Sequence, residues 1–500
     1  MPLHCPSALA LDSDTAGLLL PHSHDYTQVV CQGIVASGGG VRTLDITNQI
    51  VSPDGFERLA VVAGGTLPGP LISSRKGSRI RVNVRDQLTD RTMLKTTSIH
   101  WHGMFQKGLH TQTGPPAQTN TFWYRSHHEL QYCDGLRGPM VIYNPQDPHR
   151  GLYDFDDERF HLPAPRVTPG VPPNSTLING SGRFPLGPAV PLSIVNVAKG
   201  KRYRMRLISM AYDSRFGFSI DGHTDHRVIE TDGINTVPRS AGSIEIYPGQ
   251  RYSFILNANQ PVGNYWIRSL PTPGPQGFAD GINSAILRYK GAANEEPTST
   301  PAPVPSPLQE STLAPLQNPA APGIPQFGAA DINLRLIMGQ NCFINGVYYE
   351  APPMSVLLQI LSGARKAQDL LPAGSVYGVE RDKVVEIALT ASAPGGPHPF
   401  HLHGHAFSIA KGANNTKPNF TNPPRRDVVQ SGPPNSTVVL RLKTDNAGPW
   451  MFHCHIEFHI GLGLAVVFAE DIPRVDLLNP APQAWDELCP IYNSLAPEDQ

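Results

Sequence analysis

A cysteine flanked by two histidines, His453-Cys454-His455, is the feature that most constrains this chain. Successive side chains of an extended strand point to opposite faces, so His453 and His455 share one face and Cys454 points to the other. A soft thiolate and imidazoles together are ligands that copper prefers. One strand can therefore feed two metal sites, joined by a few covalent bonds along which electrons pass. The alternative is a buried free cysteine beside structural histidines.

Most of the other histidines are also grouped. The chain has 19 histidines, and more than half of them fall in four short clusters. Alternation along a strand places Trp101 towards a core, and His100 with His102 on the opposite face. This pair either binds metal or forms a satisfied polar face, and the spacing leaves both open. His127 and His128 are sequence neighbours that face opposite ways on a strand, so at most one of them serves a given site.

The segment H-P-F-H-L-H-G-H holds four imidazoles within eight residues. His401 and His403 share a strand face, whereas His398 is placed independently of them. His405 fits the same alternation, and spacing alone does not exclude it as a ligand. Structural zinc sites favour several cysteines at short spacings, and the sequence has none. A single cysteine among clustered histidines therefore indicates copper.

Composition favours a large all-β protein. With 500 residues, the chain is long enough for two to four domains. Charged residues make up 16%, while Pro is 51 and Gly is 46, a mix that favours many short strands joined by turns. The net charge of -1 gives no reason to expect a nucleic-acid partner. No apolar run approaches the roughly 18 residues that span a bilayer.

Several segments have a recognisable organisation. Residues 1–40 are unpatterned, and the apolar run Leu18–Leu20 is too short for a secretory signal. Residues 296–329 read as a proline-rich connector. A short helix is expected near Leu357–Ile360. His223 and His226 are expected to be structural. Strand-like runs occur at 80–84, 140–143, 193–197, 203–208, 243–246, 252–256, 383–389, 437–443 and 463–470.

The motifs H-W-H-G, H-P-F-H-L-H-G-H and H-C-H-I-E-F-H together resemble the signatures of the multicopper oxidases. The wider sequence is similar to the basidiomycete laccases within that family, for example in S-P-D-G-F at 52–56 and L-I-N-G at 177–180. The resemblance runs from about Leu44 to the C-terminus. It implies an all-β chain of three cupredoxin-like Greek-key β-sandwich domains, at 41–160 (shortened), 161–295 and 330–500, after a poorly ordered segment at 1–40.

The resemblance also implies a set of copper ligands, four coppers being expected. The type 1 copper is matched by Cys454, His398 and His459, with Leu464 at the axial position. Leucine cannot coordinate, which favours the reduced ion and raises its potential. The type 2 copper is matched by His100 and His401, and the type 3 pair by His102, His127, His403, His453 and His455. Asp213 matches an acidic residue that accepts the proton of a phenol.

The implied activity is that of a laccase. Phenols or aromatic amines lose single electrons at the type 1 site, and four electrons reduce dioxygen to water at the other three coppers. The resemblance further implies an extracellular, glycosylated monomer that takes part in lignin degradation, with sequons at Asn174, Asn179, Asn414, Asn419 and Asn435. The main alternative is a copper protein with an intact type 1 site and an impaired oxygen site. A non-enzymatic relic is a third hypothesis. An oxidase of ascorbate or ferrous iron is disfavoured, because the laccase-like sequence extends beyond the ligand motifs.

Arg125 departs from the family pattern. It stands where the family has the first histidine of an H-S-H motif, and the sequence here reads Arg125-Ser126-His127. Arginine is permanently protonated and has no lone pair to donate. His128 is a poor substitute, because it points the other way along the strand. The sequence therefore predicts that one type 3 ligand is missing.

Other departures concern the length of the chain and its disulfides. The interval from Gly103 to Thr121 is about twenty residues shorter than in the family, and a strand entering the second domain is expected to be lost near Phe160-His161. By the resemblance, Cys133 would pair with the position now held by Tyr212, and Cys489 with a cysteine of the missing stretch. Both family disulfides are therefore expected to be absent.

Overall fold

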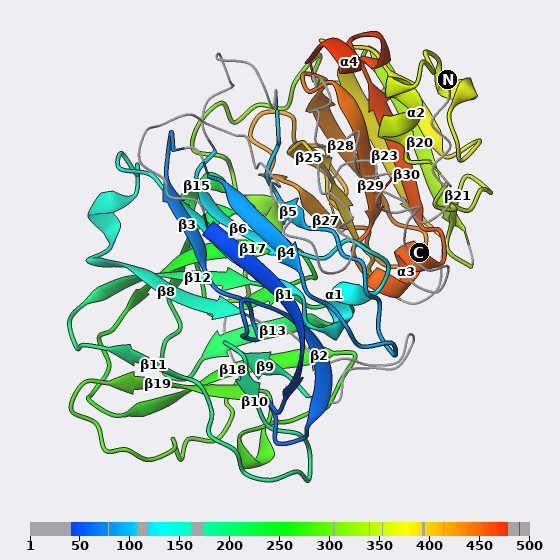
Figure 1. Ribbon diagram of the computed structural model, residues 1–500. Helices are drawn as coiled ribbons and strands as arrows, with labels where there is room; N and C mark the ends of the chain where they lie inside the picture. Colours follow the sequence, from blue (N-terminus) through cyan, green and yellow to red (C-terminus); the bar gives the residue numbers. More distant parts are fainter. Residues whose placement is uncertain are drawn as a thin grey trace.

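Three β-sandwiches follow one another along the chain (Figure 1). The computed structural model describes residues 42–78, 80–107, 118–161, 175–303, 306–339, 341–352, 354–392, 396–413, 415–478 and 490. The segment 1–40, Asn174, Asn414 and Cys489 lie outside these residues. No helix in the described part of the chain is long and apolar enough to cross a membrane.

The first sandwich packs the sheet β2-β1-β4 against the sheet β3-β7-β6-β5. Val82 and Val84 are buried between these sheets with Trp101 and Phe122, as the alternation in the sequence predicts. Its strands are β1 (Arg42–Val51), β2 (Arg58–Ala63), β3 (Ile72–Arg75), β4 (Val82–Asp86), β5 (His100–His102), β6 (Asn120–Arg125) and β7 (Arg137–Tyr143), with the short helix α1 (Gln131–Asp134) before β7.

The second sandwich packs the sheets β11-β19-β18-β13-β16 and β15-β14-β17-β12-β8 around one apolar core. Its elements are η1 (Arg150–Leu152), β8 (Phe155–His161), β11 (Ile194–Val197), β12 (Arg202–Ile208), β13 (Arg215–Ile220), β14 (His226–Thr231), β15 (Ile234–Ala241), β16 (Ile244–Ile246), β17 (Arg251–Asn257), β18 (Asn264–Thr272), η2 (Ala279–Gly281) and β19 (Ser284–Tyr289). The ribbon of β9 (Leu177–Ile178) and β10 (Ser181–Gly182) stands beside them.

The expected loss of a strand near Phe160-His161 is wrong. Strand β8 runs through these residues and pairs in parallel with β12. The Phe155 ring stacks on Tyr203 at 5.1 Å between ring centroids, and Asp156 accepts a hydrogen bond from Arg206 at 2.7 Å. These contacts hold the shortened segment against the edge of the sheet, so the pairing survives.

The third sandwich, yellow to red in Figure 1, packs the sheets β21-β20-β23-β28-β25-β26 and β22-β30-β29-β24-β27. Its strands are β20 (Ile332–Gly339), β21 (Phe343–Ile344), β22 (Val376–Val379), β23 (Val384–Ala391), β24 (Pro399–Leu402), β25 (Phe407–Lys411), β26 (Arg425–Arg426), β27 (Val428–Gln430), β28 (Thr437–Lys443), β29 (Gly448–Cys454) and β30 (Ala465–Glu470). Its helices are α2 (Val356–Leu361), η4 (Ala367–Asp369), α3 (Glu457–Gly461), η5 (Ile472–Arg474) and α4 (Val475–Leu478). The helix predicted near Leu357–Ile360 is α2. Ser355 caps its start, and the Ser355 hydroxyl accepts a hydrogen bond from the Leu358 N–H.

The proline-rich connector links the second and third sandwiches. It contains η3 (Glu310–Thr312), and Leu313 just after it is buried in the core of the second sandwich. Further along, the Arg441 guanidinium of the third sandwich donates hydrogen bonds to the carbonyls of Pro322 and Ile324. The connector therefore lies against both sandwiches instead of standing free in solvent.

Candidate metal centre

Cys454 is the last residue of β29, and its side chain meets two histidines inside the third sandwich. The Cys454 Sγ lies 3.7 Å from His398 Nδ1 and 3.4 Å from His459 Nδ1, and the two Nδ1 atoms are 3.2 Å apart. Cys454 and His398 are buried, while His459, in α3, is partly exposed. Three ligand atoms of the types that copper prefers therefore converge on one point.

Leu464 lies beside this point but has no atom to donate. It is fully buried in the core of the third sandwich, and its carbonyl accepts a hydrogen bond from the Cys454 N–H. Its own N–H bonds the carbonyl of His459. Backbone hydrogen bonds thus tie Leu464 to both Cys454 and His459, and its axial position remains a prediction.

The other face of the same strand meets further imidazoles of the third sandwich and His127 of the first. His453 is a partner of His401 in the β24–β29 pair, and its Nε2 lies 2.9 Å from His403 Nε2. His127 belongs to the same group as His403 and His453, with ligand atoms within 4.8 Å of one another. The predicted division of His453-Cys454-His455 between two faces is therefore confirmed, and a second centre lies between the first and third sandwiches.

A second group of imidazoles adjoins the first. His100 stacks on His403 at 4.1 Å, and His102 stacks on His401 at 3.8 Å between ring centroids. Both come from β5, whose middle residue Trp101 points into the core of the first sandwich. The sequence left open whether this pair faces a metal site or a polar surface. The structure places it among the other imidazoles, fully away from solvent.

Two backbone carbonyls orient the rings. His401 Nδ1 lies 2.9 Å from the Asp427 carbonyl, and His453 Nδ1 lies 2.8 Å from the Cys454 carbonyl. A carbonyl only accepts, so each Nδ1 carries the proton and each Nε2 keeps its lone pair. The Nε2 atoms point into the cluster, which is the arrangement that metal-bound histidines require.

The cluster imidazoles are held in the neutral form. Burial lowers the pKa values of His100, His102, His401, His453 and His455 well below the usual range, and the neighbouring imidazoles lower them further. Beside Cys454, burial and then His398 lower the pKa of His459 to about 3. Neutral imidazoles have lone pairs to give, so low pKa values favour metal binding.

Copper fits these residues. Both ring nitrogens of His100, His102 and His455, and the Nε2 of His401, are buried without a hydrogen-bond partner. Buried polar atoms are normally paired, and leaving several unpaired in one place is costly. A bound metal satisfies them, and the thiolate of Cys454 with two imidazoles suits copper in particular.

Arg125 does not fit this pattern. Its guanidinium is fully buried beside the cluster and donates to both carboxylate oxygens of Glu457, at 3.1 and 3.2 Å. Its Cζ lies 4.7 Å from the centroid of the Tyr132 ring. His128 is turned away, as predicted, with its Nε2 3.0 Å from the hydroxyl of Thr96. Neither residue provides a ligand to the cluster.

Asp213 lies near the Cys454 centre. It follows Tyr212, whose carbonyl accepts a hydrogen bond from the Glu457 N–H at the start of α3. The Asp213 side chain is half-buried, and burial raises its pKa to about 6. Asp213 is thus close to the element that carries His459, and its role in a substrate pocket remains a prediction.

Sequence reasoning missed an acidic group behind the imidazoles. Asp427 Oδ1 lies 3.5 Å from His102 Nε2 and 3.6 Å from His401 Nδ1. Arg251 binds this carboxylate with two hydrogen bonds, at 2.6 and 2.8 Å, and lies 3.7 Å from Asp232. The sequence signal was the charged run Arg425-Arg426-Asp427 directly before Val428 and Val429, which is unusual for a buried strand.

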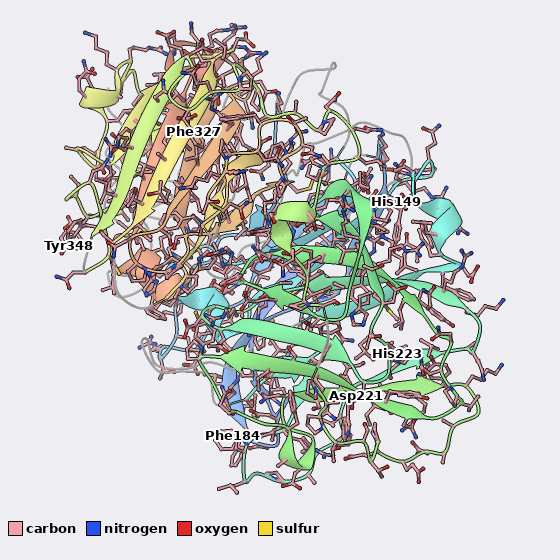
Figure 2. The ribbon with its side chains drawn as sticks, turned by 180° about the vertical axis from the view of Figure 1, so that it is seen from behind. His149, Phe184, Asp221, His223, Phe327 and Tyr348 are labelled. Carbon is pink, nitrogen blue, oxygen red and sulfur yellow. The ribbon has the colours of Figure 1, made fainter. Side chains whose placement is uncertain are left out.

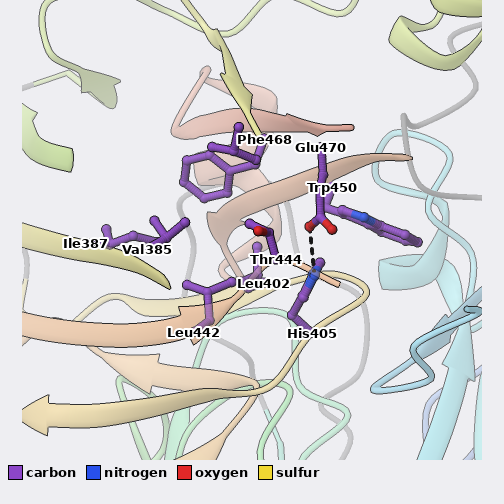
Figure 3. Close-up of a pocket in the computed structure, with 10 residues that line it drawn as sticks. Val385, Ile387, Leu402, His405, Leu442, Thr444, Trp450, Phe468 and Glu470 are labelled. Carbon is purple, nitrogen blue, oxygen red and sulfur yellow. Dashed lines mark ion pairs between the residues drawn. The ribbon is translucent and has the colours of Figure 1, made fainter. Parts of the chain in front are cut away.

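His405 is not part of either centre. Its Nε2 lies 3.1 Å from the carboxylate of Glu470, in a small cavity lined also by Trp450, Leu442 and Phe468 (Figure 3). Burial opposes its protonation, but Glu470 outweighs that effect and raises the pKa of His405. In the described residues His405 joins no group with metal-ligand geometry. The sequence left open whether His405 continues the strand alternation of His401 and His403. It does not, because β24 ends at Leu402.

His223 and His226 are structural, as predicted. His223 bonds the Asp221 carbonyl through Nδ1 at 2.8 Å and the Tyr289 hydroxyl through Nε2 at 2.7 Å. Figure 2 shows Asp221 and His223 on the second sandwich, away from the third. His226 packs edge-on against Phe254 at 4.9 Å between ring centroids. Both histidines therefore belong to the packing of the second sandwich.

Cys133 lies beside the predicted partner position without a disulfide. It is a buried free thiol in one apolar cluster with Tyr212, Trp123 and Tyr132. Tyr212 therefore fills by packing the place where the resemblance implied a second cysteine. Cys342 and Cys454 are also free cysteines in the described part of the chain.

Comparisons with known proteins agree with this geometry. Family models described as multicopper oxidase match residues 149–292, 349–474 and 45–120, which is more than half of the chain. A laccase of Trametes villosa is 50% identical over 499 residues, covering 92% of this chain and 96% of the relative. A laccase of Pleurotus ostreatus is 50% identical over 513 residues, covering 94% and 95%.

Solved structures of similar fold extend the comparison. The crystal structure of a laccase from Botrytis aclada has a TM-score of 0.76 and 27% sequence identity, covering 92% of this chain and 93% of that one. A multicopper oxidase that functions in iron import has a TM-score of 0.77 at 24% identity, covering 92% and 96%. The second likeness concerns the fold alone.

Proposed function

Because this chain belongs to the multicopper oxidase family, we propose that it is a laccase that oxidises phenols and aromatic amines and passes their electrons to dioxygen. The observation that carries the proposal is the end of β29. Cys454 faces His398 and His459 on one side, and His453 faces the imidazole cluster on the other. A single short stretch of backbone thus connects an electron entry site with a site for dioxygen.

The residues divide into three proposed ligand sets. Bound copper supplies one-electron oxidation at the Cys454 centre and the reduction of dioxygen to water at the cluster. Cys454, His398 and His459 hold the type 1 ion beside the non-coordinating Leu464. His100 and His401 hold the type 2 ion, and the type 3 ligands are His102, His127, His403, His453 and His455.

Two residues around the Cys454 centre act on the substrate, one by accepting its electron and the other by accepting its proton. His459 is the partly exposed member of its ligand set, so its ring is the contact through which a donor outside the protein passes an electron. A phenol that loses an electron becomes strongly acidic and must release its proton. Burial raises the pKa of Asp213 to about 6, so its carboxylate is ionised above that pH and accepts the proton.

Partners, location and domain division follow the same family. Small phenols and dioxygen are the proposed partners, and a monomer is the proposed state. We place the protein outside the cell, where the sequon Asn435 is exposed and Asn419 is partly exposed for glycosylation. The proposed domains are 41–160, 161–295 and 330–500. Strand β8 of the second sandwich crosses the first of these boundaries, and Leu313 of the connector adds to the second core.

A second candidate function is favoured by Arg125. A copper protein with a complete Cys454 centre takes up electrons even when its dioxygen site is impaired. The guanidinium beside the cluster supports this alternative, because it replaces a neutral donor with a cation.

Copper-loaded protein with 2,6-dimethoxyphenol tests both candidates. Blue absorption from thiolate-bound copper together with sustained oxygen uptake supports the laccase. Blue absorption that bleaches with the phenol and returns only slowly in air supports the second candidate. Protein that is folded and copper-loaded yet colourless contradicts both. Cys454→Ser is the negative control for the absorption and the oxygen uptake.

A further inference from the structure

Strand register places Arg125 on the face that carries the metal ligands. In the antiparallel pair β5–β6, His100 lies opposite Arg125 and His102 lies opposite Trp123. Directly opposed residues project their side chains from the same face of a sheet. The side chain of Arg125 is therefore directed to the cluster side, and His127, two residues further along, follows the same direction.

Among the described residues, no third imidazole forms a metal-ligand group with both His102 and His455. His102 and His455 lie 5.0 Å apart between ring centroids, and all their ring nitrogens are buried without a hydrogen-bond partner. In the described residues, the groups with metal-ligand geometry contain His102 only together with His401 and Asp427. The Asp427 carboxylate is already bound by both terminal nitrogens of Arg251. With His401 assigned to the type 2 copper, the position between His102 and His455 keeps only these two imidazoles among the described residues.

Arg125 is fixed in this place and is not free to swing out. Its Nη1 donates to both carboxylate oxygens of Glu457 and to the Ser126 carbonyl at 3.1 Å. Glu457, at the start of α3, is as deeply buried as Arg125. Breaking a buried ion pair leaves an uncompensated charge away from water, which is strongly unfavourable. The ion pair thus joins the first and third sandwiches and keeps the cation beside the cluster.

The other two guanidinium nitrogens of Arg125 cannot bind a metal ion. Its Nε and Nη2 are buried and without a hydrogen-bond partner. Both atoms carry hydrogens and neither has a lone pair, so neither is a ligand. The Arg125 Cζ lies 4.7 Å from the centroid of the Tyr132 ring, which is 6.3 Å from the centroid of His455. A cupric ion at His102 and His455 would meet the positive charge of Arg125.

We propose that Arg125 closes one copper position, so that the chain binds three copper ions and the position between His102 and His455 stays without metal. This rests on the proposed function, because it assumes copper at the Cys454 centre, at His100 with His401, and at His127 with His403 and His453. The copper at His127, His403 and His453 then lacks the second ion with which it would form a spin-coupled type 3 pair. Two neighbouring cupric ions couple their spins and become silent in electron paramagnetic resonance, whereas an isolated cupric ion stays visible.

Copper counting and spin counting on the same sample test the proposal. For the oxidised wild-type protein we expect three coppers per chain by elemental analysis and three spins by integrated paramagnetic resonance. For Arg125→His we expect four coppers and two spins, because the added imidazole completes a coupled pair. Four coppers in the wild type, or three in a folded Arg125→His variant, would overturn the proposal.

Arg125→Gln is the matched control. It removes the positive charge from the same position without adding an imidazole. We expect three coppers and three spins for this variant. Four coppers would contradict the view that the position needs a third imidazole to bind metal. Arg125→His removes the cation that Glu457 binds and can fail to fold for that reason. In that case the anomalous X-ray signal of copper in wild-type crystals tests the proposal. A peak between His102 and His455 contradicts the proposal. Blue absorption reports copper at the Cys454 centre independently of these counts. Its absence would contradict the proposed function, whereas a wrong copper count with blue absorption would contradict only the present proposal.

Discussion

His401 on β24 lies directly opposite His453 on β29, as antiparallel partners within one sheet of the third sandwich. Directly opposed residues share a face, so this register alone delivers two imidazoles to one side of the sheet. The next pair along, Phe400 opposite Cys454, faces the core of the sandwich. The sheet therefore separates the two metal centres while the backbone between His453 and Cys454 connects them.

Replacement of the cysteine separates metal binding from folding. We expect Cys454→Ser to abolish the blue absorption and to lower the copper content by one per chain, because a neutral hydroxyl cannot replace a thiolate. The loss of volume is small, so the cooperative unfolding transition remains. Absorption spectroscopy and elemental analysis check this. Cys342→Ser changes a half-buried thiol of the same sandwich and serves as the control, which keeps its colour.

A glycine keeps space for two cluster imidazoles. Gly249 has φ +82, and a Cβ at this position would lie 2.7 Å from His455 Cδ2 and 3.0 Å from His102 Cε1. We expect Gly249→Ala to displace these rings and to lower the stability by about 1–3 kcal/mol. Melting curves and copper content measure the effect. Gly217→Ala adds the same methyl group where nothing lies within 4 Å and is expected to behave as the wild type.

The buried ion pair behind the cluster contributes to stability. Arg251 is fully buried and compensates Asp427 and Asp232. We expect Arg251→Met to lower the free energy of unfolding by about 3–5 kcal/mol, because both carboxylates lose their shared partner. Urea titrations of the copper-free protein give this value. Arg215→Met, which breaks a largely exposed pair with Glu245, is expected to cost much less. Equal losses in the two variants would contradict the assignment.

Proton acceptance by Asp213 predicts a specific pH profile. Burial raises the pKa of Asp213 to about 6, so the carboxyl is protonated below that pH and ionised above it. Phenol oxidation is expected to fall as the pH drops through 6, because a protonated carboxyl cannot accept a proton. Asp213→Asn should lower kcat/KM for phenols above pH 6 by about 100-fold and remove that inflection. Oxidation of ferrocyanide, which releases no proton, should be unchanged in the variant. An inflection that persists in the variant assigns it to another group.

Local sequence patterns determined much of the molecule. The alternation in H-W-H, H-L-H and H-C-H fixed which side chains share a face, because a strand has a period of two whatever it packs against. The proline and glycine content with short alternating runs predicted the all-β fold. The permanent charge of Arg125 follows from its chemistry alone, as does the inability of Leu464 to coordinate.

The tertiary structure decided which groups the strand faces contact. The sequence does not say that His405 turns to Glu470, that Arg251 from the second sandwich holds Asp427, or that Gly249 approaches His455. It also does not say that Glu457 neutralises Arg125, from 332 positions away. Strand periodicity is a local property of the backbone, whereas these contacts depend on how distant sandwiches pack. The sequence by itself therefore determined the ligand types and their faces, and only the packing of the three sandwiches decided which groups surround each metal position.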